Sequence, residues 1–111
     1  MDSILEQERI DLRDMQTFHE WLDEIKQFDK DPMTNLAYLA GEVGEVINAV
    51  RYLRRSDEAG LEAAREHIAE ELSDCLAFIC KLANRFEIDL HDAYVQKMTH
   101  NVGRTWQPNN R

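Results

Sequence analysis

The chain has 111 residues, and its 22 acidic and 13 basic side chains give a formal net charge of −9. This balance argues against a nucleic acid polymer as a partner, because binding to a phosphate backbone depends on clustered Lys and Arg. There is no signal-peptide pattern and no uncharged apolar run of about 18 residues, so we expect a cytoplasmic protein without a membrane partner.

The length predicts a single domain over residues 1–111 with a modest core. Pairing with further copies would help to bury its apolar surface, so we expect a homodimer or a homotetramer. Only four Gly and two Pro interrupt the chain, and apolar residues recur at helical spacing. These features indicate an all-α fold.

Four main helices are predicted in chain order. After a polar lead-in, the first runs from about Asp11, an expected N-cap, to about Asp29. The second runs from about Met33 to Arg55 and the third from about Leu61 to Phe86. The fourth starts after a cap at Asp89 and fades near Trp106, before a tail (107–111) that we expect to be mobile. We expect these helices to form one antiparallel bundle.

The second and third helices each carry an apolar stripe, and we expect the two stripes to pack against each other. The short segment between the helices makes them antiparallel. The second helix contributes Leu36, Leu39, Val43, Ile47, Val50 and Leu53, and the third contributes Ile68, Leu72, Cys75, Ile79, Leu82 and Phe86.

Two glutamates interrupt the second helix in the sequence GEVGEV. Glu42 and Glu45 are the only charges from residue 33 to residue 50, although a window of 18 residues in a chain that is 32% charged should hold about six. Lone carboxylates are costly to bury unless they are paired, hydrogen-bonded or bound to a metal. The pattern therefore predicts a site.

The third helix repeats this pattern with Glu71 and Asp74, and Asp74 is the only charge from residue 72 to residue 80. At roughly 100° per residue, both acid pairs lie about 80° and 140° from the centres of their stripes, in the same sense. On antiparallel helices, equal offsets point to the same side. The midpoint of the two pairs is residue 58, in the turn, so we expect all four carboxylates to converge.

Four converging carboxylates would repel one another unless a cation lay among them. Mg²⁺ is the natural guest, with Mn²⁺ as a substitute, because hard cations prefer carboxylate ligands. A di-iron site would require Glu-x-x-His motifs, and none of the four histidines has a Glu three positions before it. Zinc has no support either, because Cys75 and Cys80 lie on different faces of one helix, where we expect them as reduced thiols.

The spacing Glu42-x-x-Glu45, 25 residues, then Glu71-x-x-Asp74 resembles the MazG-like all-α nucleoside triphosphate pyrophosphohydrolases. The likeness extends through LAGEVGEVINAV, IAEELSDCLAFICKLA and IDLHDAYVQKMTHNVGRTW, over about residues 11–106. The resemblance implies Mg²⁺-dependent cleavage of an NTP or dNTP between the α- and β-phosphates, giving a monophosphate and pyrophosphate. It further implies nucleotide-pool house-cleaning by dimers or tetramers whose sites form near subunit contacts.

The resemblance also implies roles for particular residues. The catalytic metal ligands would be Glu42, Glu45, Glu71 and Asp74, one of them acting as the base through a water. The phosphate-contacting residues would be Lys97, Asn101 and Arg104, which share one face of the fourth helix. Family members commonly carry Glu at the position of Gly41, so a fifth carboxylate is absent there.

Five further residues have two readings each. Asn48 could reach a base or ribose, or be a buried amide that bonds backbone. Glu70 could assist the acids, although a surface acid is the simpler interpretation. Trp21 and Phe18 could stack on a base, but we favour core packing for both. His67 lies four residues before the second acid pair and could orient Glu71, or simply be exposed.

Two alternatives to the pyrophosphohydrolase remain. One is a phosphoribosyl-ATP pyrophosphatase-like enzyme, and the other is a non-catalytic helical dimer module in which the acids bind a structural cation.

The two glycines of GEVGEV are unusual inside a helix. Gly41 and Gly44 each cost about 1 kcal/mol of helix propensity, which is easier to accept where another helix or a substrate must come close.

Overall fold

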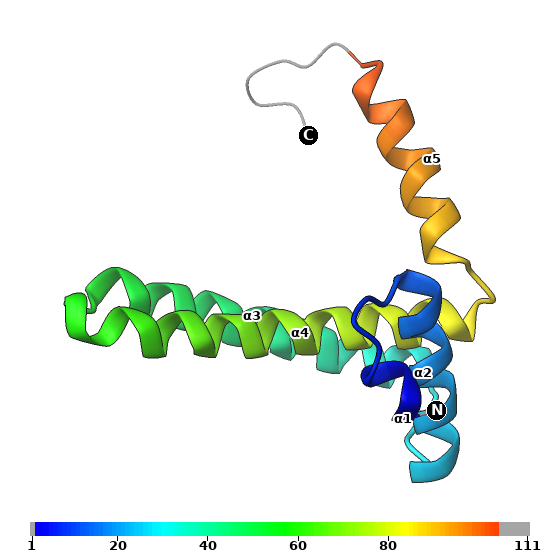
Figure 1. Ribbon diagram of the computed structural model, residues 1–111, viewed down its shortest axis with the longest axis horizontal. Coiled ribbons are helices and arrows are strands. Elements are labelled where there is room, and N and C mark those ends of the chain that lie inside the picture. The colour runs from blue at the N-terminus through cyan, green and yellow to red at the C-terminus, as the bar shows by residue number, and fades with distance from the viewer. Residues whose placement is uncertain (1, 105–111) are drawn as a thin grey trace.

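The computed structural model describes residues 2–104 and consists there of helices and connecting turns, without strands (Figure 1). The predicted all-α class is confirmed. The elements are α1 (Asp2–Leu5), α2 (Leu12–Lys26), α3 (Pro32–Arg55), a 3-10 turn η1 (Glu58–Gly60), α4 (Leu61–Arg85) and α5 (Leu90–Val102). Within this range, no helix is long and apolar enough to cross a lipid bilayer.

Aspartate caps begin the helices where the sequence predicts them. The Asp11 side chain accepts a hydrogen bond from the backbone N–H of Asp14, whose own carboxylate accepts one from Asp11 N–H. This reciprocal pair satisfies donors that a helix leaves unpaired at its start. The Asp89 side chain likewise accepts from Asp92 N–H. Both predicted caps are confirmed.

The first and last helices are shorter than predicted. α2 ends at Lys26 rather than near Asp29, because Gln27 adopts a left-handed conformation with φ of 53° and so closes the helix. α5 ends at Val102, and Trp106 and the tail lie outside the described residues. The expected polar lead-in includes the short helix α1, whose Ile4 is buried.

The helices do not form one bundle within the chain, so that expectation is wrong. α3 and α4 make a long antiparallel hairpin, α2 crosses the end of the hairpin away from its turn, and α5 projects away from it (Figure 1). There are also five α-helices among the described residues rather than four. The bend between α4 and α5 contains Glu87 in a left-handed conformation, with φ of 55°, which redirects the chain.

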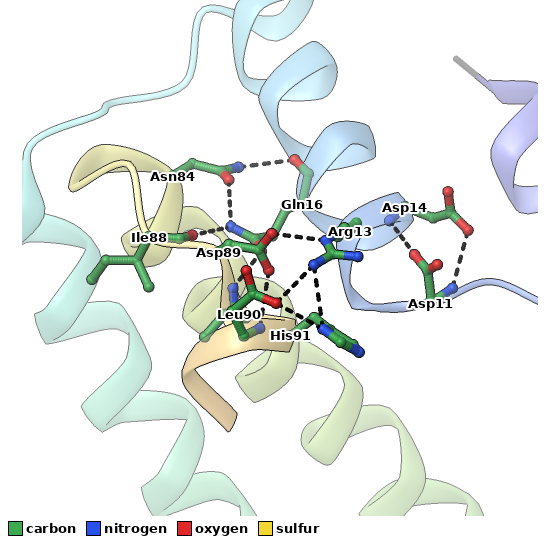
Figure 2. A network of polar contacts seen from close by, with 10 residues as sticks. Asp11, Arg13, Asp14, Gln16, Asn84, Ile88, Asp89, Leu90 and His91 are labelled. Carbon is green, nitrogen blue, oxygen red and sulfur yellow. Dashed lines mark hydrogen bonds and ion pairs between the residues drawn. The ribbon is translucent and has the colours of Figure 1, made fainter. Parts of the chain in front are cut away.

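The first turn of α5 is fastened to α2 by a polar network (Figure 2). The Arg13 guanidinium donates to Asp89 at 2.7 Å and to Asp92 at 2.8 Å. Its hydrogen bond to Asp89 lowers the pKa of that carboxyl below 3.8. The side-chain Oε1 of Gln16 accepts a hydrogen bond from Leu90 N–H at 2.9 Å. These contacts fix where α5 begins, while every side chain from residue 91 to residue 100 is exposed.

A line of buried and half-buried residues runs along each helix of the hairpin, and we call the two lines together the inner seam. They recur every three or four positions, as expected where two helices meet. The inner seam consists of Asn35, Leu39, Glu42, Val46, Ala49 and Leu53 from α3, and Ala64, Ile68, Glu71, Cys75, Phe78 and Leu82 from α4.

Large apolar residues lie beside the inner seam and stay exposed. We call them the apolar side: Leu36, Val43, Ile47, Val50, Leu72 and Ile79, which are 38–53% exposed. Each follows a seam residue by one position on its helix. Equal offsets on antiparallel helices place them on the same side of the hairpin. The expectation that whole apolar stripes pack within the hairpin is therefore wrong, because four of the six stripe residues of α3 and three of the six of the other stripe are exposed.

A candidate metal and substrate site on the hairpin

Three of the four predicted acids lie together in the middle of the hairpin. Oxygen atoms of Glu42, Glu71 and Asp74 are all within 4.8 Å of one another. Glu42 and Glu71 belong to the inner seam and are half-buried, and Asp74 is exposed at its edge. The three carboxylates come from two helices that a short turn holds antiparallel, as the matched spacing predicted.

The fourth acid, Glu45, belongs to a second group that overlaps the first. Ligand atoms of Glu45, His67 and Glu71 are also within 4.8 Å of one another, and His67 Nε2 lies 4.0 Å from Glu71 Oε1. Glu71 is shared by both groups, and its side chain is only 14% exposed. The four acids thus form one continuous patch centred on Glu71 rather than a single four-ligand cluster.

The electrostatics of the patch show the cost of gathering these acids. A hydrogen bond between Glu42 and Glu71 is the main cause that raises the pKa of Glu42 above its usual 4.5, followed by partial burial and by the charges of Glu71 and Asp74. Burial, and then the charges of Glu42, Asp74 and Glu71, raise the pKa of the Cys75 thiol. Like charges at this spacing favour protonation unless a cation is present.

This donor set fits a hard divalent cation. It offers carboxylate oxygens from two rigid helices, which is the chemistry that Mg²⁺ and Mn²⁺ prefer. His67 adds a nitrogen donor beside Glu45. Cys75 and Cys80 are both free thiols, as expected.

An aromatic cleft lies one helical turn from the acids, away from the hairpin turn. Tyr38 precedes Glu42 by four residues and Phe78 follows Asp74 by four, so each ring shares a helix face with an acid. The two rings lie 5.8 Å apart between centroids. With Phe28 they line a cleft of about 300 Å³.

A buried charge pair stands at the end of this cleft. Lys81 lines the cleft, and its Nζ lies 3.2 Å from Oδ1 of Asp23 on α2, whose side chain is 1% exposed. The same ammonium lies 4.8 Å from the centre of the Phe28 ring and 5.1 Å from that of Phe78. The buried amide of Asn35 donates to the carbonyls of Asp29 and Asp31, which holds the loop that carries Phe28.

The predicted phosphate-binding residues lie on α5, which projects away from the hairpin (Figure 1). Lys97 is exposed, Asn101 is half-buried with its amide 3.9 Å from the sulfur of Met98, and Arg104 follows the end of the helix. The chain therefore does not bring these three residues to its own acids.

The five residues for which the sequence left two interpretations differ in their exposure and neighbours. Asn48 is exposed on α3 rather than buried, and Glu70 is exposed on α4. Trp21 and Phe18 are half-buried with ring centroids 5.8 Å apart. Trp21 lines a separate open groove along α2, away from the aromatic cleft. His67 has a half-exposed side chain near Glu71.

Contacts among residues 2–104 require neither glycine of GEVGEV. Within that range, a Cβ atom on Gly41 or on Gly44 would meet no heavy atom within 4 Å outside its own stretch of helix. The described residues thus leave room for a substrate or another copy to approach there.

Sequence reasoning missed the aromatic cleft and the charge pair. The spacing of Tyr38 and Phe78, four residues from Glu42 and Asp74, could have revealed the cleft. No local signal marks the pair of Asp23 and Lys81, because the two residues are 58 positions apart.

The comparisons with known proteins agree with this geometry. Residues 30–104 match the family model described as the MazG nucleotide pyrophosphohydrolase domain. The chain is also similar to dCTP pyrophosphatase 1 of Mus musculus, at 33% identity over 96 residues that cover 83% of this chain and 49% of the relative. It thus spans about half the length of that curated relative. Because the family match takes in the whole hairpin, α5 and more than half of the chain, the protein belongs to the MazG nucleotide pyrophosphohydrolase domain family.

Proposed function

We propose that the protein is a divalent-cation-dependent pyrophosphohydrolase of nucleoside triphosphates in the cytoplasm. Water would add to the α-phosphorus, the bond from that phosphorus to the oxygen bridging to the β-phosphate would break, and the products would be a nucleoside monophosphate and pyrophosphate. The observation that carries the proposal is the gathering of Glu42, Glu71 and Asp74 oxygens within 4.8 Å on a rigid hairpin. Family membership supports the same reaction.

The acids would hold Mg²⁺, with Mn²⁺ as a substitute. When bound, the cation neutralises phosphate charge and lowers the pKa of the attacking water. Glu42, Glu71 and Asp74 would hold it in position, because their helices fix the carboxylates. Glu45 lies at the exposed edge of the patch, where a carboxylate can accept the proton of the attacking water.

The aromatic cleft would take the nucleobase. A base stacks favourably on aromatic rings whatever its identity, and Tyr38, Phe78 and Phe28 provide such rings. One helical turn, about 5.4 Å, separates these positions from the acids along each helix. This separation suits a nucleotide whose phosphates lie at the acids and whose base lies in the cleft.

A second copy of the chain would complete the site. The radius of gyration is 16.7 Å, against about 13 Å for a compact domain of this length. The accessible surface is 8515 Å², against about 6,300 Å² for a compact monomer of this mass. We place the partner on the apolar side. Lys97, Asn101 and Arg104 on the projecting α5 would then bind phosphates held by the acids of another copy.

The test is a screen for pyrophosphate release with Mg²⁺ and with Mn²⁺ across canonical and modified NTPs and dNTPs. The name of the mouse relative makes dCTP the first nucleotide to try. We expect a monophosphate and pyrophosphate in equal amounts, identified by ³¹P NMR. Release of single phosphates would contradict the proposed cleavage position. A folded protein inactive on the whole panel would favour the non-catalytic module.

A further inference from the structure

The charge pair at the end of the aromatic cleft has a feature that an ordinary buried ion pair lacks. Asp23 is 1% exposed, and Lys81 Nζ is 3.2 Å from its Oδ1, yet neither carboxylate oxygen receives a hydrogen bond of normal geometry from the residues that the structure describes. The two side chains thus form an ion pair without a well-aligned hydrogen bond. An ammonium has three N–H bonds, so donors remain for a further acceptor.

The surroundings of Lys81 hold this side chain in place. It is only 11% exposed, and burying a charge is costly unless an opposite charge accompanies it. Asp23 on α2 supplies that negative charge. The rings of Phe28 and Phe78 lie within about 5 Å of the charge, where cation–π attraction adds to the hold. The cleft thus ends in a fixed cation with donors to spare.

The position of Lys81 relative to the acids decides what it can touch. Lys81 follows Asp74 by seven residues on α4, which is about 10 Å along the helix axis. Phosphates at the acids would therefore lie about two helical turns from Lys81 along α4. The group of a bound nucleotide that would extend to the end of the cleft, past the rings of Tyr38 and Phe78, is the base.

We propose that Lys81, held by Asp23, selects nucleotides whose base carries a carbonyl oxygen. An ammonium has three hydrogen-bond donors and no acceptor. It can therefore donate to a carbonyl oxygen of a base, whereas an exocyclic amino group would face it with another donor. Adenine is the common base without a carbonyl, and it would be the poorest substrate. Lys81 is then a specificity-determining residue and Asp23 a positioning residue. The inference rests on the proposed pyrophosphohydrolase function.

The experiment compares dITP with dATP, which differ at position 6 of the purine by a carbonyl in place of an amino group. Replacing Lys81 alone would leave Asp23 buried without a partner, which destabilises a fold strongly. The test variant is therefore Asp23→Leu with Lys81→Met, which exchanges the pair for apolar side chains of similar size. Thermal unfolding confirms that the double variant is folded.

We expect wild-type protein to prefer dITP over dATP. In the double variant, kcat/KM for dITP should fall by roughly 10- to 100-fold, mainly through KM, because a hydrogen bond to a charged group is lost. The value for dATP should stay unchanged. The single variant Lys81→Arg, which keeps the positive charge, should retain part of the preference. Lys26→Met, at an exposed lysine of α2, should leave it intact.

Two results would overturn the inference. One is an equal fall for both nucleotides, which would assign the pair a structural role. The other is a dITP to dATP ratio that is the same in wild type and double variant. A wild type that releases pyrophosphate from no nucleotide would overturn the proposed function and this inference together, so the two failures are distinguishable.

Discussion

The apolar side and the inner seam of the hairpin divide the large apolar residues between an exposed surface and a covered one. The inner seam holds two glutamates and small side chains such as Ala49 and Ala64, which are each 2% exposed. The apolar side holds large aliphatic residues such as Ile47, which is 49% exposed. In a self-sufficient helical hairpin the aliphatic residues would fill the seam.

The difference indicates what each surface is for. Glu42 and Glu71 face each other across the seam within hydrogen-bonding reach. At these two positions the seam thus gives up hydrophobic stabilisation for a cluster of carboxylates. The apolar side carries the stabilisation that the seam lacks, and it delivers this only when another surface covers it.

The largest expected effect tests the seam at Glu71, which both acid groups share. Glu71→Gln should lower kcat/KM for pyrophosphate release on the order of 1,000-fold, because the cation loses a central ligand. In the presence of a chelator, the same variant should unfold at a higher temperature than wild type, since repulsion with Glu42 and Asp74 is relieved. Activity assays and thermal melts measure the two effects.

The matched control is Glu70→Gln, one position away and exposed. It should change neither activity nor melting temperature. Full activity in Glu71→Gln would show that the carboxylates of the inner seam take no part in the reaction.

The second test breaks the apolar side. Ile47→Asp should weaken self-association by roughly 100-fold or more, because burying a side chain of this size contributes about 1.5–3 kcal/mol and a charge there must also be desolvated. Light scattering and sedimentation across a concentration series measure the change. Ile47→Ala, which stays apolar, should have a smaller effect. A monomeric wild type would show that the apolar side serves no second copy.

The third test concerns α5, which is fastened to α2 rather than to either surface of the hairpin. The Arg13 bond holds the pKa of Asp89 below 3.8. A carboxyl with a lowered folded-state pKa stabilises above its unfolded value and loses that contribution as the pH falls through the folded value. We therefore expect protection of α5 amides against hydrogen exchange to fall below about pH 3.8, sooner than that of α3 amides.

Arg13→Met should weaken this protection already at neutral pH and remove its acid dependence. Arg9→Met is the matched control, because Arg9 is exposed outside the network. Identical acid profiles for wild type and Arg13→Met would mean that the ion pair does not hold α5.

The smallest effect is expected from Gly44→Ala, beside the seam. Among the residues that the structure describes, no atom outside the surrounding helix lies within 4 Å of the added Cβ, so the unfolding free energy should rise by about 1 kcal/mol through helix propensity. Denaturant titration measures this gain. A stabilised variant that assembles normally but loses activity would show that a substrate needs the glycine. Unchanged activity and assembly would count against any close approach there.

The sequence was informative where the structure depends on local patterns. Apolar spacing and aspartate caps located the main helices, and the equal spacing of Glu42, Glu45, Glu71 and Asp74 predicted that acids from two helices would meet. Periodicity reports which residues are apolar but not what covers them, so it could not divide each stripe into seam and apolar side. The direction of α5 depends on Arg13 and Asp89, which are 76 positions apart, and such contacts leave no local signal.

The crossing of α2 over α4 has a consequence for the order of folding. The hairpin contacts join residues on either side of a short turn, whereas α2 is tied to the end of α4 by Gln16 and Asn84, 68 positions apart. Closing a longer loop costs more chain entropy before any contact rewards it. The hairpin should therefore form first, with its acids already in register. Asp23 reaches Lys81 only when α2 docks, so the capacity to hold a cation arises earlier in folding than the capacity to tell one base from another.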